Sequence, residues 1–215
     1  EVLEDIDNQN IDSIICLGDL VGYGPHPNEV IALIKRRNIL CLKGNYDASV
    51  VDNDYTYIRD TDINSFSLPW TVEELRTSNR YYLDNLPDDL SMNVCGKSIK
   101  FVHGSPRKIN EYLSEDYSEL DEIMDELKED VLVCAHTHIP YAKKIGNKVI
   151  INDGSVGKPK NGKPHATYVI LDFSNEFKLK VEMKTVPYEF RRTMKDMELK
   201  NFPQKLIYSY EFGKE

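Results

Sequence analysis

Three of the chain's five histidines follow two short, largely apolar runs. His103 comes directly after residues 98–102 (SIKFV), and His136 and His138 come after residues 131–135 (VLVCA). Such runs are typical of strands buried on both faces, and ligands bind at the carboxyl ends of such strands. If the chain stays extended, the two imidazoles of the HTH motif point the same way. An HxH motif by itself favours a strand end whose histidines merely face solvent, because two histidines at this spacing often occur by chance.

Two further apolar runs end at potential metal ligands. Asp19 comes shortly after residues 11–17, and Asn45 comes shortly after residues 39–42, each directly behind a glycine. Carboxylate, amide and imidazole groups together suit borderline divalent ions such as manganese, iron, nickel, cobalt or zinc. A carboxylate such as Asp19 can bridge two ions about 3.5–4 Å apart, the spacing used in two-metal phosphoester hydrolysis.

The elements that position these ligands form an α/β pattern. An amphipathic helix is expected over residues 28–37, between strands at 11–17 and 39–42, and this βαβ unit predicts that the two strands are parallel. Residues 48–90 form a polar and aromatic excursion with a helix at 71–83, which we interpret as a lid-like wall over the strand ends. The whole chain, residues 1–215, is predicted to be one domain.

The remaining elements follow from alternation and turn signals. Hairpins are expected at residues 92–102, 141–151 and 166–186. An acidic helix is expected at residues 118–127, and a helical tail from residue 188 onward.

Composition restricts the class of protein. The formal charge is −9 and no basic stripe is visible, which argues against a nucleic-acid-binding protein. No apolar run approaches the roughly 20 residues that a membrane span needs. The four cysteines form no CxxC pair, so we expect free thiols in a reducing cytoplasm.

The order of the motifs carries a family resemblance. GD, GN, VHG and HTH in this order resemble the calcineurin-like metallophosphoesterase family, and GDLVGYGPHPNEV, HGSPR and DGSVGKP resemble its small bacterial and archaeal members. The resemblance covers nearly the whole chain. It implies a four-layer α/β/β/α sandwich of two mixed sheets flanked by helices. It further implies that Asp19 bridges two divalent ions, that Asn45, His103 and His136 hold one of them, and that His138 helps to hold the other.

The implied activity is hydrolysis of phosphomonoesters or phosphodiesters at a dinuclear metal centre. Two alternatives stay open: a catalytically impaired metal-binding or regulatory homologue, and a hydrolase specific for dinucleoside polyphosphates or phosphoproteins. A small phosphoester or nucleotide-like compound is the expected substrate, and the sequence leaves a homo-oligomer open.

The sequence departs from the family pattern at two places. The family's DxH motif, which supplies two more ligands, is absent, so we expect a domain that lacks its first strand and part of a helix. The chain also has GNYD where many members have GNH followed by an acidic residue. Tyr46 therefore replaces a histidine credited with stabilising the transition state or protonating the leaving group. Asn45, Tyr46 and Asp47 are the catalytic candidates, with Asn45 also a phosphate contact.

Several other residues have two interpretations. Asp47 could orient a histidine ligand or cap the following helix. Arg107 could clamp a phosphate or form an exposed ion pair. Lys158, Lys160 and His165 could contact substrate or belong to a surface loop, and His26 has no assignment.

Overall fold

The strands of the computed structural model, which describes residues 1–175 and 178–214, form three hydrogen-bonded groups within those residues. Two short strands, β1 (Ile15–Cys16) and β2 (Leu40–Cys41), pair in parallel, as the βαβ pattern predicts. A long antiparallel hairpin contains β8 (His165–Asn175) and β9 (Lys178–Pro187). The largest sheet has the order β3 (Asp89–Val94), β4 (Lys97–Val102), β5 (Val131–Cys134), β7 (Lys148–Asn152), β6 (Tyr141–Ile145).

The central strand of the five-stranded sheet is β5, and it is buried on both faces. It pairs in parallel with β4 on one side and β7 on the other, while β3 and β6 add antiparallel edges. Val131 and Val133 pack into one hydrophobic cluster, and Leu132 and Cys134 pack into another on the opposite face. The unbroken apolar run is therefore explained by two cores that share one strand.

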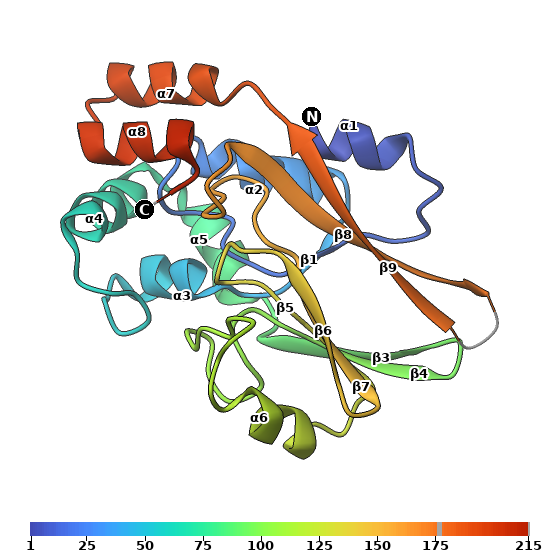
Figure 1. Cartoon of the computed structure of the whole chain (residues 1–215). Coiled ribbons are helices and arrows are strands. Elements are labelled where there is room, and N and C mark those ends of the chain that lie inside the picture. The colour runs from blue at the N-terminus through green and yellow to red at the C-terminus, as the bar shows by residue number, and fades with distance from the viewer. Residues whose placement is uncertain (176–177, 215) are drawn as a thin grey trace.

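Four layers result from this packing (Figure 1). Helix α6 (Leu120–Glu126) covers one face of the sheet, and the β8–β9 hairpin packs against the other face together with the β1–β2 pair. Helix α1 (Val2–Asp7) packs on the outer side of that hairpin. Helix α2 (Pro27–Arg36) connects β1 to β2. The predicted α/β sandwich flanked by helices is confirmed, with a parallel pair and an antiparallel hairpin in place of the second mixed sheet.

The excursion after β2 contains three helices: α3 (Asn45–Asp52), α4 (Asp62–Glu74) and α5 (Thr77–Asp84). The prediction of one helix over residues 71–83 is wrong, because the backbone is extended at Leu75 and Arg76. The buried Asn28 side chain explains the break: it donates to the Glu74 carbonyl at 2.9 Å and accepts from the Arg76 amide at 3.0 Å. A distant side chain thus replaces the helical hydrogen bonds at this point.

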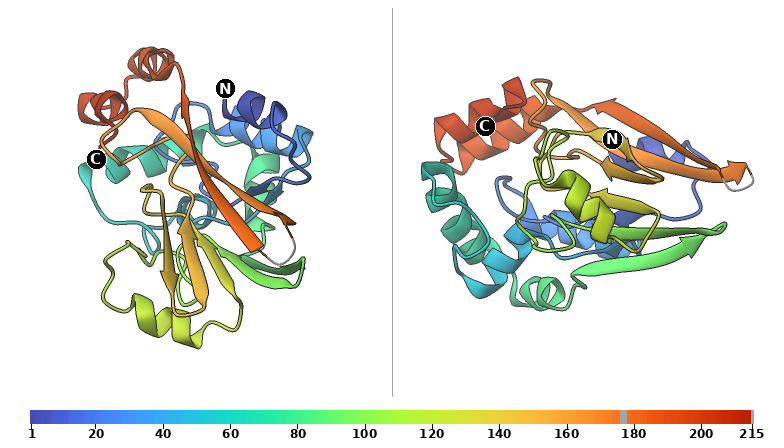
Figure 2. Two further views of the ribbon diagram at one scale, coloured as in Figure 1. Left: turned by 45° about the vertical axis from the view of Figure 1, so that its right-hand side comes forward. Right: turned by 60° about the horizontal axis from the view of Figure 1, so that its bottom comes forward.

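The C-terminal helices α7 (Phe190–Leu199) and α8 (Gln204–Phe212) pack together beside α4 (Figure 2). Phe202, between the two helices, contacts Phe66 and Trp70 of α4 with ring centroids 5.0 and 4.7 Å apart. Among the described residues, none of the helices has the length and apolar character needed to span a membrane. The C-terminal helices therefore pack against the excursion through α4.

Replacement of Leu132 by alanine should test the two-sided core. The side chain is fully buried in β5, so Leu132→Ala is expected to lower the free energy of unfolding by about 2–5 kcal/mol. Met183 on β9 is 39% exposed, and Met183→Ala is expected to cost roughly 1 kcal/mol or less. Chemical denaturation of both variants provides the comparison. Equal losses for the two variants would contradict this description of the core.

Candidate metal centre

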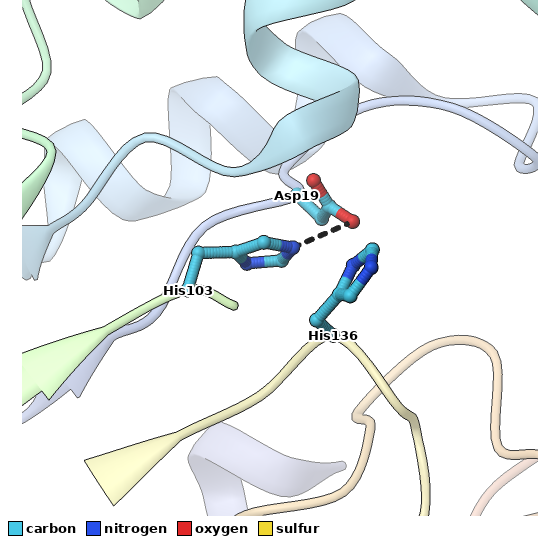
Figure 3. A group of neighbouring side chains, drawn as sticks. All are labelled: Asp19, His103 and His136. Carbon is cyan, nitrogen blue, oxygen red and sulfur yellow. Dashed lines mark ion pairs between the residues drawn. The ribbon is translucent and has the colours of Figure 1, made fainter. Parts of the chain in front are cut away.

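Side chains from three strand ends converge on one small volume (Figure 3). Asp19 follows β1, His103 follows β4 and His136 follows β5. One ligand atom of each residue lies within 4.8 Å of those of the other two. The carboxyl ends of parallel strands bring these residues together, as expected for ligand sites in α/β folds.

His103 is oriented by the backbone. Its Nδ1 lies 2.7 Å from the Leu17 carbonyl oxygen and donates to it, so a neutral ring carries its lone pair on Nε2. That Nε2 faces Asn45 Oδ1 at 2.9 Å and an Asp19 carboxylate oxygen at 3.3 Å. The Asn45 amide is fixed because its Nδ2 donates to the Tyr57 carbonyl oxygen at 3.0 Å.

Three atoms that carry lone pairs therefore face one another. This arrangement is unfavourable unless a proton or a cation lies between them. Burial opposes a charge on His103, but the Asp19 carboxylate outweighs it and raises the pKa of His103 to about 9. Burial also tends to raise the pKa of Asp19, yet the adjacent His103 lowers it below its usual value. A divalent ion fits the same donors in place of the proton.

His136 adds a ring nitrogen without a hydrogen-bond partner to the same cluster. Its ring is buried and its Nε2 has no hydrogen-bond partner, a costly arrangement for a polar atom away from water. Burial, and then repulsion from His103, lower the pKa of His136 to about 3, so the imidazole is neutral. A bound ion would satisfy this nitrogen, and the residues present therefore fit a metal site.

His138 lies on the same cavity but outside the three-residue cluster. Its Nδ1 donates to the Lys158 carbonyl at 2.5 Å, and burial followed by the Lys160 charge lowers its pKa to about 4. The HTH segment does not stay extended, so the condition for two imidazoles that point the same way is not met. His136 and His138 have φ values of 61° and 60°, in the left-handed region, and β5 ends at Cys134. The histidines reach one cavity through two turns of the backbone instead of through strand alternation.

Glycines allow the two ligand loops to touch. A Cβ atom on Gly44 would lie 2.1 Å from Asp19 Oδ1, and one on Gly18 would lie 2.4 Å from the Gly44 amide nitrogen. Asp19 itself has φ 57°, a strained value for a residue with a side chain. The loop after β1 therefore lies directly on the N-terminus of α3.

Asp47 holds the loop after β1 against the start of α3 through hydrogen bonds. Its buried carboxylate accepts from the amides of Gly44 (2.9 Å), Asp19 (2.8 Å) and Leu20 (2.9 Å). Burial and the nearby Asp19 charge raise its pKa to about 7. Of the two interpretations of Asp47, these contacts favour the helix cap, extended here to hold the Asp19 loop as well.

Tyr46 is committed to structural contacts. Its backbone amide donates to Asp19 Oδ1 at 2.8 Å, its ring lies 4.6 Å from that of Tyr23, and its hydroxyl donates to Asn64 Oδ1. Burial, followed by the neighbouring Tyr23, raises the pKa of Tyr46 well above its usual value. These contacts do not favour the phenol as a proton donor near neutral pH.

Arg107, the predicted phosphate clamp, is engaged elsewhere. Its guanidinium pairs with Glu119, Glu122 and Glu126 of the α6 region at 3.0, 2.7 and 3.0 Å. It does not line the cavity that contains Asp19. The arrangement favours the ion-pair interpretation, because three carboxylates already surround the guanidinium.

The remaining histidines lie apart from the cluster. His165 begins β8 opposite Pro187, and His26 Nε2 lies 3.0 Å from Asp196 Oδ2. Neither lines the cavity, whereas Lys158 and Lys160 do.

The cavity over the cluster has a volume of about 270 Å³. Its wall includes residues to which sequence reasoning gave no role: Tyr23, Tyr57, Arg59, Asn64, Tyr112, Lys205. Tyr23 lies in the GDLVGYGPHPNEV motif, and the other five come from loops and helices without a recognisable motif. The expected wall from residues 48–90 covers Tyr57, Arg59 and Asn64. Lys205 belongs to α8, in the part of the chain for which the sequence predicted only a helical tail.

Comparison with known proteins gives one family. A sequence profile of the calcineurin-like phosphoesterase superfamily domain matches residues 1–176. An uncharacterised protein of Methanocaldococcus jannaschii is 33% identical over 221 residues, covering 94% of this chain and 87% of the relative.

Two solved structures are similar over almost their whole length. A metallophosphoesterase from Sphaerobacter thermophilus is 26% identical with a TM-score of 0.82, covering 98% of this chain and 93% of that one. A hypothetical protein from Pyrococcus horikoshii is 25% identical with a TM-score of 0.89, covering 100% and 92%.

Manganese should stabilise the folded protein through this cluster. A ligand bound only by the folded state raises the melting temperature, so Mn²⁺ at 100 times its dissociation constant should add about 2.7 kcal/mol. The variant His136→Ala removes one donor and is expected to lose most of this stabilisation. His165→Ala removes a histidine outside the cluster and should keep it. Thermal unfolding with and without Mn²⁺ measures both; equal stabilisation of the two variants would contradict the site.

Proposed function

The chain belongs to the calcineurin-like phosphoesterase superfamily, and we propose that it hydrolyses phosphoesters at the cluster of Asp19, Asn45, His103 and His136. The observation that supports this most directly is the convergence of a carboxylate, an amide oxygen and imidazole nitrogens that lack enough protons to satisfy one another. When bound there, a divalent ion supplies a Lewis acid for a phosphate oxygen and lowers the pKa of water. Manganese, iron, nickel, cobalt and zinc all suit this donor set.

The protein's own residues then have distinct tasks. The Leu17 carbonyl holds the Nδ1 proton of His103 and fixes the tautomer that presents Nε2. Asp47 and the two loop glycines keep Asp19 within reach of Asn45. Burial of Asn45, His103 and His136 shields their donor atoms from water, which strengthens electrostatic interactions with a phosphate.

We extend the proposal to a second ion held with the help of Asp19 and His138. The Nδ1 hydrogen bond of His138 to Lys158 leaves its Nε2 available, and both residues line the same cavity. Asp19 Oδ1 accepts from the Tyr46 amide, and Oδ2 is the oxygen directed toward His103. A carboxylate in this position is the kind of group that bridges two ions.

A metal-binding or regulatory role without hydrolysis is the second candidate. The observation in its favour is Tyr46, whose hydroxyl is held by Asn64 and whose raised pKa makes it a weak acid. The described residues also contain four free cysteines, which fits the proposed reducing cytoplasm for either role.

Hydrolysis can be tested with p-nitrophenyl phosphate and bis-p-nitrophenyl phosphate in the presence of Mn²⁺. The wild-type chain is expected to release p-nitrophenol, and His103→Ala should lower kcat/KM by at least about 100-fold because it removes an ion ligand. His165→Ala serves as the matched histidine control and should stay within about threefold of wild type. Turnover by wild type that does not exceed that of His103→Ala would support the non-catalytic candidate.

The variant Tyr46→Phe distinguishes a structural role of the Tyr46 hydroxyl from a catalytic one. It removes a buried hydroxyl and leaves Asn64 Oδ1 without its donor, so the free energy of unfolding should fall by about 1–3 kcal/mol. Because the phenol is not expected to transfer a proton, kcat at saturating Mn²⁺ should fall by no more than about fivefold. A loss in kcat above about 100-fold with normal stability would make Tyr46 a catalytic acid.

A further inference from the structure

Two cysteines lie opposite each other on the strands that lead to two of the candidate metal ligands. Cys16 of β1 and Cys41 of β2 are direct partners in the parallel register of these strands. Asp19 follows Cys16 by three residues, and Asn45 follows Cys41 by four residues. A change in the chemistry of this pair therefore takes place directly behind the two ligand loops.

The two thiols point to the same face of the strand pair. Cys16 and Cys41 pack into one hydrophobic cluster, whereas their neighbours Leu17 and Leu42 pack into another. Successive side chains of a strand point to opposite faces, so this division places both sulfur atoms on one side. They lie close enough for a hydrogen bond between the thiols, which, followed by burial, raises the pKa of Cys41 well above its usual value.

The spacing of the two strands permits a disulfide between them. Neighbouring strands lie about 4.7–4.9 Å apart, and the Cα atoms of a disulfide are usually about 4.4–6.8 Å apart. Opposed residues on adjacent strands are thus near the short end of this range, and their disulfide carries strain. Strained disulfides are more easily reduced than structural ones and are typical of regulatory sites.

The two thiols differ in access to an oxidant. Cys16 is partly exposed, whereas Cys41 is only 4% exposed. A small oxidant in solution therefore reaches Cys16 first. Cys41 is held opposite Cys16 by the strand register, so its reaction with an oxidised Cys16 is intramolecular. Such proximity favours the reaction of a thiol that is otherwise a weak nucleophile.

We propose that Cys16 and Cys41 are a redox modification site, at which a peroxide forms a reversible disulfide that lowers the affinity of the metal site for a divalent ion. First, the Cys16 thiol takes one oxygen from a peroxide ROOH, which gives a sulfenic acid and ROH. The Cys41 sulfur then attacks the Cys16 sulfur. The S–S bond forms, the S–O bond breaks, and the hydroxyl leaves with the thiol proton as water. The two thiols lose two electrons in total, and the O–O bond of the peroxide takes them up.

The backbone connects this pair to the ligand loops. The Leu42 amide donates to the Cys16 carbonyl at 2.9 Å, and the Cys41 thiol donates to the Leu42 carbonyl at 3.3 Å. A disulfide removes the thiol proton of the second contact and requires the two Cβ atoms to approach to about 3.5–4.5 Å. Just beyond the pair, Gly18 and Gly44 are packed so closely that neither has room for a Cβ atom. The loops therefore have no free space in which to absorb the movement.

Movement at these glycines reaches the ligands. Asp19 follows Gly18 directly, Asn45 follows Gly44 directly, and both side chains face Nε2 of His103. Loss of an outer contact that orients metal ligands typically lowers metal affinity about 10–100-fold. We therefore expect weaker ion binding by the oxidised chain. This part of the inference rests on the proposed function, because it uses the same metal site.

Peptide mapping tests whether the disulfide forms. The full chain carries Cys95→Ser, which removes an exposed thiol able to link two molecules. It is treated with hydrogen peroxide, desalted, denatured with N-ethylmaleimide, digested and analysed by mass spectrometry. We expect peptides joined through Cys16 and Cys41 as the main oxidised product, and their separation after dithiothreitol. Cys134 is the internal control: it is buried, its register partner on β7 is Asn152, and it should remain available to N-ethylmaleimide.

Calorimetry with Mn²⁺ measures the effect on the metal site. The oxidised, reduced and re-reduced chains are each desalted before titration. We expect the oxidised chain to bind Mn²⁺ at least about tenfold more weakly than the reduced chain, and reduction to restore the affinity. Cys16→Ser in the same background is the matched control, because it cannot form the disulfide and should keep its affinity after peroxide treatment. Cys16→Ala provides a second control, and melting temperatures verify that all variants are folded.

Three results would overturn the inference: no peptides joined through Cys16 and Cys41, a disulfide-linked chain that binds Mn²⁺ as tightly as the reduced chain, or an equal loss of affinity in Cys16→Ser. Its failure is distinguishable from failure of the proposed function. A reduced chain that binds Mn²⁺ and hydrolyses phosphoesters but forms no disulfide would retain the function and remove this inference. A disulfide in a chain whose reduced form binds no Mn²⁺ would retain the modification site and remove both its effect on ion binding and the metal site.

Discussion

The buried carboxylate of Asp47 is the interaction on which the rest of the site depends. It accepts three backbone hydrogen bonds, one from the start of α3 and two from the loop after β1. Carboxylates that accept several amide hydrogens form strong, geometrically demanding contacts. Because Gly18 and Gly44 have no side chains at the point of contact, the two loops approach closely enough for Asp19 and Asn45 to face the same nitrogen of His103. The ligand cluster is thus a consequence of how two loops are joined.

The core around β5 fixes the other side of the site, which carries His136 and His138. β5 is packed on both faces, so the segment that follows it starts from a fixed position. His136 and His138 then adopt left-handed backbone conformations, as does Asp19 on the facing loop. Such conformations cost about 1–3 kcal/mol each and persist where the surrounding structure determines them. Their occurrence at three candidate ligands fits a site whose donor atoms are held in advance of ion binding.

Much of this organisation could be predicted from sequence, and the reasons are local. Apolar runs and turn residues gave the hairpins, and the runs that stop at Asp19, Asn45, His103 and His136 predicted ligands at strand ends. What could not be predicted depends on distant contacts. The helix breaks at Leu75 because Asn28 binds the backbone there, and Arg107 forms ion pairs with glutamates of the α6 region. Lys205 reaches the cavity because α8 docks on the loop at 157–163, which no local pattern encodes.

The proposed site would bind an anion within a strongly acidic protein. Basic side chains of the described cavity wall, together with a bound metal, would make this cavity more positive than the net charge of −9 suggests. The most direct test is a crystal of the full chain grown or soaked with Mn²⁺ and measured at a wavelength where manganese scatters anomalously. The account predicts an anomalous peak between Asp19, Asn45, His103 and His136, at about 2.0–2.3 Å from their donor atoms. Density elsewhere only, or contacts of His103 with Asn45 and Asp19 that persist unchanged at saturating Mn²⁺, would contradict it.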